Sequence, residues 1–165
     1  MVRGLRSEAG SAAVEFALIA PIFLALLVAI IETALVFFTQ QILQTAATQT
    51  ARLIMTGQAQ TQNLTAEQFQ QDVCGKLPAM FNCANLYVNV QNFTSFSTVS
   101  MLNPLINGSI KSSSMTYGLG VGGDIEVLQI FYLWPALTAP LGFGLPNING
   151  NYLLVATAVF RNEPF

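Results

Sequence analysis

Few side chains in this sequence can do acid–base, nucleophilic or metal chemistry. The 165 residues include 6 Lys and Arg, 8 Asp and Glu, two cysteines and no histidine. Without histidine there is no imidazole to act near neutral pH and no neutral nitrogen ligand for zinc, so Ser-His-Asp triads and histidine-based zinc sites are excluded. The carboxylates that stand out by position are Glu15 and Glu32, inside an apolar stretch, and a closely spaced pair, Asp124 and Glu126.

The composition excludes further classes of protein. Only 8% of the residues are charged and 53% are hydrophobic, against about 25% charged in an average soluble domain. The formal net charge is −2 without a basic run, which disfavours binding to nucleic acid. No convergent set of titratable groups is present, so we expect no enzyme activity, no cofactor, no metal site and no small-molecule substrate.

The apolar residues are concentrated near the N-terminus. Residues 16–31 contain no charged or strongly polar side chain, and residues 12–38 are interrupted only by two acids and a threonine. As a helix, the first range spans about 24 Å and its extension to residue 38 about 35 Å, which bracket the hydrocarbon layer of a bilayer. Nothing downstream is long enough for a second crossing, so the sequence predicts a single transmembrane helix.

The charges beside this helix predict its orientation. Arg3 and Arg6 precede the helix, whereas residues 39–50 contain no Lys or Arg. This asymmetry places the N-terminus in the cytoplasm and exports the rest of the chain. A cleaved secretory signal peptide is the alternative, but the apolar run is too long and no A-x-A site follows it closely.

Two cysteines lie in the predicted exported region. An oxidising compartment favours pairing of Cys74 with Cys83, and we expect a disulfide. Their spacing is not the C-x-x-C of redox enzymes, and two thiolates without histidine make a poor zinc site. Two buried, reduced cysteines are the alternative.

Helical periodicity continues beyond the membrane. Apolar residues recur at three- and four-residue spacing as far as Ile54, which predicts a helix over about residues 12–55 that ends at Gly57. Thr65 and Gln68 form a capping-box pattern for a second helix over residues 66–77.

The period then changes to two. Residues 86–91, 125–133 and 152–160 are predicted strands, and residues 94–123 and 135–150 are predicted long loops. We expect an α+β fold in which a three-stranded antiparallel sheet is covered by the continued N-terminal helix, like a lollipop on its stem.

Two features of the exported region resemble ligand sites. The glycine-rich residues 118–123 lack the lysine of a P-loop and a following helix, so a turn before a strand is expected. Asp124 and Glu126 would share one face of that strand. Without a third acid nearby, we expect a solvated sheet face and not a cation site.

The most specific pattern is a short basic leader, then Gly10-Ser-Ala-Ala-Val-Glu15-Phe16, then the apolar helix. It resembles the prepilin-peptidase site of type IV pilins, in which the bond after the glycine is cut and a glutamate is fifth in the mature chain. The resemblance implies cleavage between Gly10 and Ser11. A carboxylate within a lipid-facing helix costs about 2.5 kcal/mol or more unless neutralised or paired. We therefore expect Glu15 to pair with the new α-amino group of Ser11 or of a neighbouring subunit; the alternative is an acid at headgroup level.

A wider stretch is similar to the TadE/TadG-like pseudopilins of Tad (Flp) pilus systems. It comprises residues 12–21, Ile30-Ile-Glu32-Thr and the Gln/Ala-rich helix that ends in Ala51-Arg52; the C-terminal residues 156–165 also resemble the family. The family implies a minor pilin-like subunit that a prepilin peptidase processes and that assembly of adhesive pili requires. Its partners would be other minor and major pilins and the inner-membrane assembly platform. The short exported region favours a TadE- or TadF-type member, although Thr33 replaces an expected aromatic residue.

The resemblance also divides the chain. It implies a cytoplasmic leader over residues 1–10, a transmembrane and stem helix over 11–57, and a periplasmic α+β domain over 58–165, in the bacterial inner membrane or incorporated into a pilus. The alternative is an unprocessed single-pass protein whose periplasmic domain binds a ligand or an envelope partner.

Subunit contacts are predicted along the lipid-embedded helix. Pro21 removes one helical hydrogen bond and is expected to bend the helix. Small residues four apart, Ala13 with Ala17 and Ala25 with Ala29, let helix backbones approach closely. Glu32 would be an ordinary interfacial acid or a group that faces a partner. The residues expected to contact other subunits are Glu15, Phe16, Pro21 and Glu32.

Overall fold

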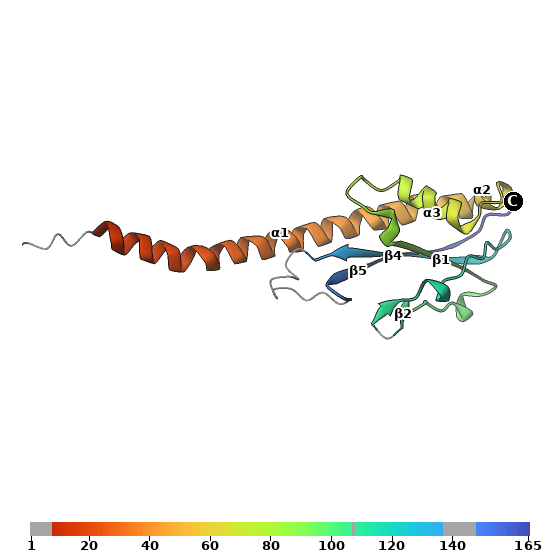
Figure 1. The fold of residues 1–165 in the computed structure, drawn as a ribbon. Coiled ribbons are helices and arrows are strands. Elements are labelled where there is room, and N and C mark those ends of the chain that lie inside the picture. Colours follow the sequence, from red (N-terminus) through yellow and green to blue (C-terminus); the bar gives the residue numbers. More distant parts are fainter. Residues whose placement is uncertain (1–7, 107, 137–147) are drawn as a thin grey trace, which may run out of the picture.

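A single long helix carries a small α+β head on its C-terminal half, and its N-terminal half projects away from the head (Figure 1). The computed structural model describes residues 8–106, 108–136 and 148–165. The predicted α+β class and the stem-and-head shape are confirmed. Most of the predicted leader and part of the predicted loop at 135–150 lie outside the described residues.

The long helix, α1 (Glu8–Met55), begins earlier than predicted and therefore includes the Gly10–Ser11 bond. Between Ser11 and Thr56 the sequence has no glycine, and its only proline is Pro21, so little interrupts the helix. It ends as predicted at Gly57, whose φ of +75° is left-handed and whose N–H donates to Ile54 O at 3.0 Å.

Two shorter helices follow α1. The single turn of α2 (Gln58–Thr61) leads to α3 (Ala66–Gly75), which begins with the predicted capping box. The Thr65 hydroxyl accepts from Gln68 N at 3.3 Å, and Gln68 Oε1 accepts from Thr65 N at 3.0 Å. The helix ends at Gly75, within the region 75–78 in which its end was expected.

The three predicted strands form one antiparallel sheet in the order β1-β4-β5. Strand β1 (Leu86–Phe93) and strand β5 (Asn151–Arg161) pair with opposite edges of β4 (Ile125–Pro135). As the central strand, β4 is buried on both faces, which agrees with its nearly continuous apolar sequence.

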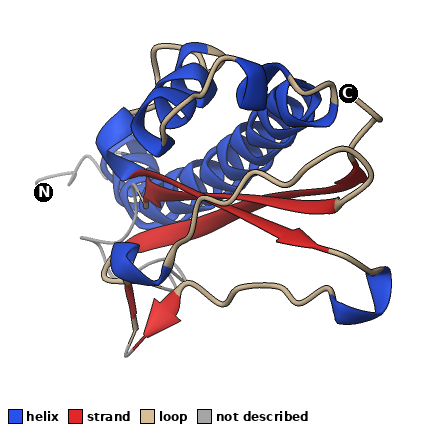
Figure 2. Cartoon of the chain, turned by 90° about the vertical axis from the view of Figure 1, so that its right-hand side faces the viewer, coloured by secondary structure: helices blue, strands red, loops and turns tan. Residues whose placement is uncertain are grey.

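The long connection between β1 and β4 covers the sheet face opposite the helices (Figure 2). It includes two 3-10 turns, η2 (Phe96–Thr98) and η3 (Ser112–Ser114), and a hairpin that was not predicted, β2 (Leu105–Ile106) with β3 (Ser109–Ile110). The connection also corrects one expectation. Asn89, predicted on the outer side of a half-buried strand, is fully buried, and its Oδ1 accepts from Thr116 N of this connection at 2.9 Å.

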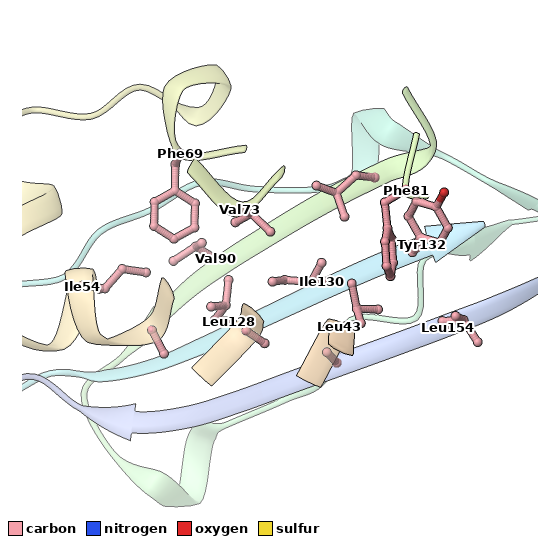
Figure 3. Packing of buried hydrophobic residues seen from close by; sticks show 14 of the residues in the cluster. Leu43, Ile54, Phe69, Val73, Phe81, Val90, Leu128, Ile130, Tyr132 and Leu154 are labelled. Atoms are coloured by element: carbon pink, nitrogen blue, oxygen red, sulfur yellow. The ribbon is translucent and has the colours of Figure 1, made fainter. Parts of the chain in front are cut away.

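The core lies between the helices and the other sheet face. Leu43 and Ile54 of α1 and Phe69 of α3 pack on Leu128 and Ile130 of β4 (Figure 3). An aromatic cluster extends this core, because the Phe81 ring meets the Tyr132 ring edge-on at 4.8 Å. The C-terminal half of α1 therefore packs one apolar face on the core, in agreement with the predicted amphipathic helix.

Glutamine side chains attach the helices to the sheet edges. Gln40 Nε2 and Gln44 Nε2, one turn apart on α1, donate to Val155 O at 2.7 Å and Thr157 O at 3.1 Å, on the edge strand β5. On the other edge, Gln70 Nε2 of α3 donates to Leu86 O at 2.8 Å. These bonds satisfy backbone carbonyls that no neighbouring strand reaches, and they hold the head to the stem.

Cys74 and Cys83 form the predicted disulfide, with their Cα atoms 5.9 Å apart. The bridge joins the end of α3 to the 3-10 turn η1 (Cys83–Asn85), which leads directly into β1. It therefore ties the second helix to the start of the sheet.

Removing the disulfide should destabilise the head without unfolding it. We expect the double substitution Cys74→Ser/Cys83→Ser to lower the free energy of unfolding by about 2–3 kcal/mol, because the short loop is no longer closed in the unfolded chain. Chemical denaturation measures this change. A reductant should lower the stability of the wild type and leave that of the double variant unchanged; an equal response of both would contradict the assignment.

Loss of the two α1 glutamines should loosen the edge of the sheet. We expect Gln40→Ala/Gln44→Ala to cost about 1–3 kcal/mol, since each hydrogen bond contributes about 0.5–1.5 kcal/mol. Amide hydrogen exchange should rise in β5 more than in β1. The matched control is Gln41→Ala, because Gln41 is exposed on the same helix; an equal effect of the control would show that these bonds contribute nothing specific.

Candidate assembly interface on the long N-terminal helix

The N-terminal half of α1 is apolar and exposed. Among the described residues, α1 is the one helix long and apolar enough to cross a membrane. Its most apolar 18-residue segment has a mean hydropathy of 2.7, and the rest of the protein does not bury that segment. This fits the predicted single-pass membrane anchor. We call residues 10–38 of α1 the anchor and residues 39–55 the stem.

The predicted processing site lies within the first turns of the anchor. Ser11 Oγ donates to Glu15 Oε1 at 3.3 Å, one helical turn away, and both residues are exposed. Phe16 is 73% exposed beside them. In the unprocessed chain the Ser11 nitrogen is a backbone amide, so the ion pair between Glu15 and a new terminal amine stays a prediction.

The remaining predicted contact residues are spread along the anchor. Pro21 lies inside α1, and the helix is visibly curved over its apolar half (Figure 1). Glu32 is only 5% exposed, although Ile31 and Thr33 beside it are exposed. Seventeen residues, or about 25 Å of helix, separate it from Glu15. The two acids therefore lie far apart in the structure: Glu15 is exposed, and Glu32 is covered by other parts of the chain.

A shallow apolar groove lies on one side of the last part of the anchor. Ala29, Ile30, Thr33, Ala34 and Phe37 line it. Thr33 fits this surface because its hydroxyl donates to Ala29 O at 2.8 Å, which satisfies the only polar group of the side chain within its own helix. Ala25 and Ala29, predicted as a pair of small residues, share the four-residue spacing with Thr33. Such a surface lets a second helix approach closely.

The glycine-rich loop before β4 does not form an open phosphate cradle. Gly120 N donates to Glu126 Oε1, and Val121 N donates to Asp124 Oδ2 at 3.0 Å, so these N–H groups already bind the chain's own acids. This agrees with the predicted turn before a strand.

The same loop corrects a second expectation. Both acids lie against Gly120, as residues on a shared face should, but Glu126 is fully buried and not solvated. Gln60 of α2 and Asn162 after β5 close over it, with Gln60 Nε2 donating to Gly120 O at 3.2 Å and Asn162 Nδ2 donating to Glu126 Oε1 at 3.2 Å. No local sequence signal could have found these partners, because each lies far away in the chain.

Burial dominates the electrostatics of this acid. Desolvation raises the pKa of Glu126 to about 7, against the lowering effect of the hydrogen bonds from Gly120 and Asn162, and the charge of Asp124 raises it further. Glu126 is therefore an acid that can titrate near neutral pH.

The comparison with known protein families finds a match within the long helix and none in the head. Together, the exposed anchor, the continuous stem and the α+β head fit a stalked protein with a single membrane anchor. Residues 10–52 match the TadE-like protein family, which confirms the resemblance stated from the residues of this helix. The family indicates a Tad pilus-related, minor pilin-like protein with pilins as partners. No curated protein and no solved structure matches the chain.

Proposed function

We propose that this chain is a minor pseudopilin required for assembly of a Tad-type adhesive pilus. In this proposal, a prepilin peptidase cuts it after Gly10, and its anchor packs against other minor and major pilins. The single observation that carries the proposal is the family match over residues 10–52, which covers α1 from Gly10 to three residues before its end.

The proposed topology follows from charge. Arg3 and Arg6 retain the N-terminus in the cytoplasm, and the head lies in the periplasm of a bacterial inner membrane until the subunit joins the assembly platform or the fibre. The peptidase acts at the cytoplasmic end of the anchor, where Gly10 and Ser11 lie. Its cut removes both leader arginines and creates a terminal amine on Ser11.

Glu15 would then set the register between subunits. From Ser11 to Phe38 the anchor contains no Lys or Arg, so a terminal amine is the cation that the processed helices themselves supply at this depth. A lipid-buried carboxylate without a partner costs about 2.5 kcal/mol or more, and the N-terminal end of the helix dipole adds to the attraction. One such pair per contact would favour a single axial offset between neighbouring helices.

The groove along the anchor supports this mode of packing. Its small residues allow close approach of a second helix, and Thr33 presents no unsatisfied hydroxyl to that helix. Because Gln40 and Gln44 fasten the head to the stem, the position of α1 in an assembly would also determine where the head lies. The proposed role of the chain is structural and includes no reaction catalysed by it.

A second candidate function is a membrane-anchored periplasmic interaction domain that is never processed. One observation favours it: the family match ends at residue 52, so the head that would bind a partner lies outside the match. The two functions differ in whether the first ten residues are removed.

Cleavage can be measured directly. We expect the intact mass of the protein purified from its own membranes to correspond to a chain that begins at Ser11 when the peptidase is present. The full-length mass should be found when the peptidase is deleted and when Gly10 is replaced by valine. A full-length mass in cells that contain the active peptidase would favour the unprocessed interaction domain instead.

The role of Glu15 can be separated from cleavage. We expect Glu15→Ala to abolish piliation while leaving membrane insertion and the mass of the processed chain unchanged, because only the pairing between subunits is lost. Electron microscopy of cells and intact-mass measurement provide the two results. The matched control is Glu8→Ala, which removes an acid that cleavage discards and should leave pili normal. Normal pili in the Glu15→Ala strain would remove this residue from its proposed role.

A further inference from the structure

The last residues of the chain form a strap across the C-terminal end of α1. Asn162 N donates to Asp124 O at 2.8 Å, and Glu163 N donates to Met55 O at 2.9 Å. The Phe165 ring lies so close to Gly57 that a side chain there would collide with it. We call residues 162–165 the strap. It connects the end of β5, the glycine-rich loop and the end of α1, beside α2 (Figure 1).

Glu126 lies beneath the strap, and only one of its two carboxyl oxygens has a hydrogen-bond partner among the described residues. Its Oε1 accepts from Gly120 N and from Asn162 Nδ2, the latter at 3.2 Å. Its Oε2 is buried and has no hydrogen-bond partner among the described residues, and the same is true of Asn162 Oδ1. Both side chains are almost completely buried, at 0% and 3% exposure. With Glu126 ionised, both unpartnered atoms are acceptors, and neither can satisfy the other.

One proton on Oε2 resolves this conflict. A carboxylic acid and a primary amide can form two hydrogen bonds at once, because the amide N–H donates to one carboxyl oxygen and the acid O–H donates to the amide oxygen. The bond from Asn162 Nδ2 to Glu126 Oε1 is the first half of that arrangement. A protonated Oε2 supplies the donor for the second half, toward Asn162 Oδ1.

We propose that Glu126 is protonated in the folded head and that its acid–amide pair with Asn162 is a pH-sensitive latch that holds the strap closed. Loss of the proton leaves a buried charge and two unpaired acceptor oxygens beneath the strap. Both costs are relieved when Asn162 moves away and water enters, so deprotonation opens the strap. This inference is independent of pilus assembly and goes beyond the proposed function.

The charges around Glu126 favour the protonated form. Asp124 of the glycine-rich loop is a like charge, whereas Glu163 of the strap is exposed, where solvent and salt screen its charge. Two cations lie on the neighbouring elements: Arg161 donates through Nε to Gly123 O at 2.9 Å, and Arg52 is exposed in the last turn of α1. From α2 the facing side chain is the uncharged Gln60. Burial and the charge of Asp124 accordingly raise the pKa of Glu126 to about 7.

A bound cation is the competing way to bridge the two oxygens. Calcium takes six to eight oxygen ligands. Apart from Glu126 Oε2 and Asn162 Oδ1, the described residues nearby offer one more buried oxygen without a partner, Gln60 Oε1. Three oxygen ligands are too few for calcium, so the structure favours a proton as the bridge between the two oxygens. Calcium is therefore added in one part of the test below.

The test compares the full-length chain in detergent micelles with the variants Glu126→Gln and Glu163→Gln between pH 5 and 8. The folded carboxyl binds its proton more tightly than the unfolded one, so its contribution to stability is complete below about pH 4.5 and is lost as pH rises through about 7. We expect the wild-type midpoint of thermal unfolding to fall by about 5 °C or more from pH 5 to 8 relative to that of Glu126→Gln.

The two variants give opposite expectations. In Glu126→Gln the new amide can donate to Asn162 Oδ1 at every pH, so the strap should stay protected from hydrogen exchange at pH 8. Glu163→Gln removes an exposed acid of the same strap and should behave like the wild type, whose strap amides lose protection at pH 8.

Three results would overturn the latch. One is an equal pH dependence in the wild type and Glu126→Gln. Another is a ¹³C NMR titration of the wild type in which every glutamate carboxyl titrates near 4.5, a measurement that also decides the matter if the glutamine variant fails to fold. The third is restoration of the wild-type midpoint at pH 8 by calcium chloride but not by magnesium chloride, which would assign the two oxygens to a cation.

Discussion

The structure depends on one helix whose two halves suit different environments: an apolar half that fits a lipid bilayer and an amphipathic half that packs on the sheet. In lipid every backbone N–H and C=O must be paired within the segment, which requires a continuous helix wherever the chain crosses the bilayer. The same helix then provides Leu43 and Ile54 to the core of the head. The turns are continuous from the anchor into the stem, so the predicted membrane segment and the part of the helix that packs on the sheet belong to one element.

Buried polar groups complete the attachment of head to helix. Glutamines on α1 and α3 satisfy backbone carbonyls at the edges of the sheet, and Asn89 fastens the long β1–β4 connection to the opposite face. Each of these groups has its partner in a distant part of the chain, so each contributes only once the fold is complete. Glu126 differs from these amide side chains because it is a carboxyl group and can titrate, and one of its oxygens has no donor among the described residues.

These features are consistent with a subunit whose helix is its means of association. An apolar groove with an internally satisfied threonine lies on the anchor, while the carboxylate at its beginning is exposed. The disulfide and the glutamine contacts lie within the head and along the stem, and the strap lies at the C-terminal end of α1. Substitutions in the anchor and in the head can therefore test the proposed association and the stability of the head separately.

Local patterns in the sequence determined the elements: the apolar run, the end of α1 at Gly57, the capping box at Thr65 and the alternating strands all follow from interactions between residues near each other in the chain. The resemblance of the N-terminal residues to TadE-like proteins was also readable there. Only the tertiary structure decided that Asn89 and Glu126 are buried, that Gln40 and Gln44 reach β5, and that Asn162 faces Glu126. The physical reason is that burial of a polar side chain depends on which distant segment covers it, and neither periodicity nor spacing encodes that covering segment.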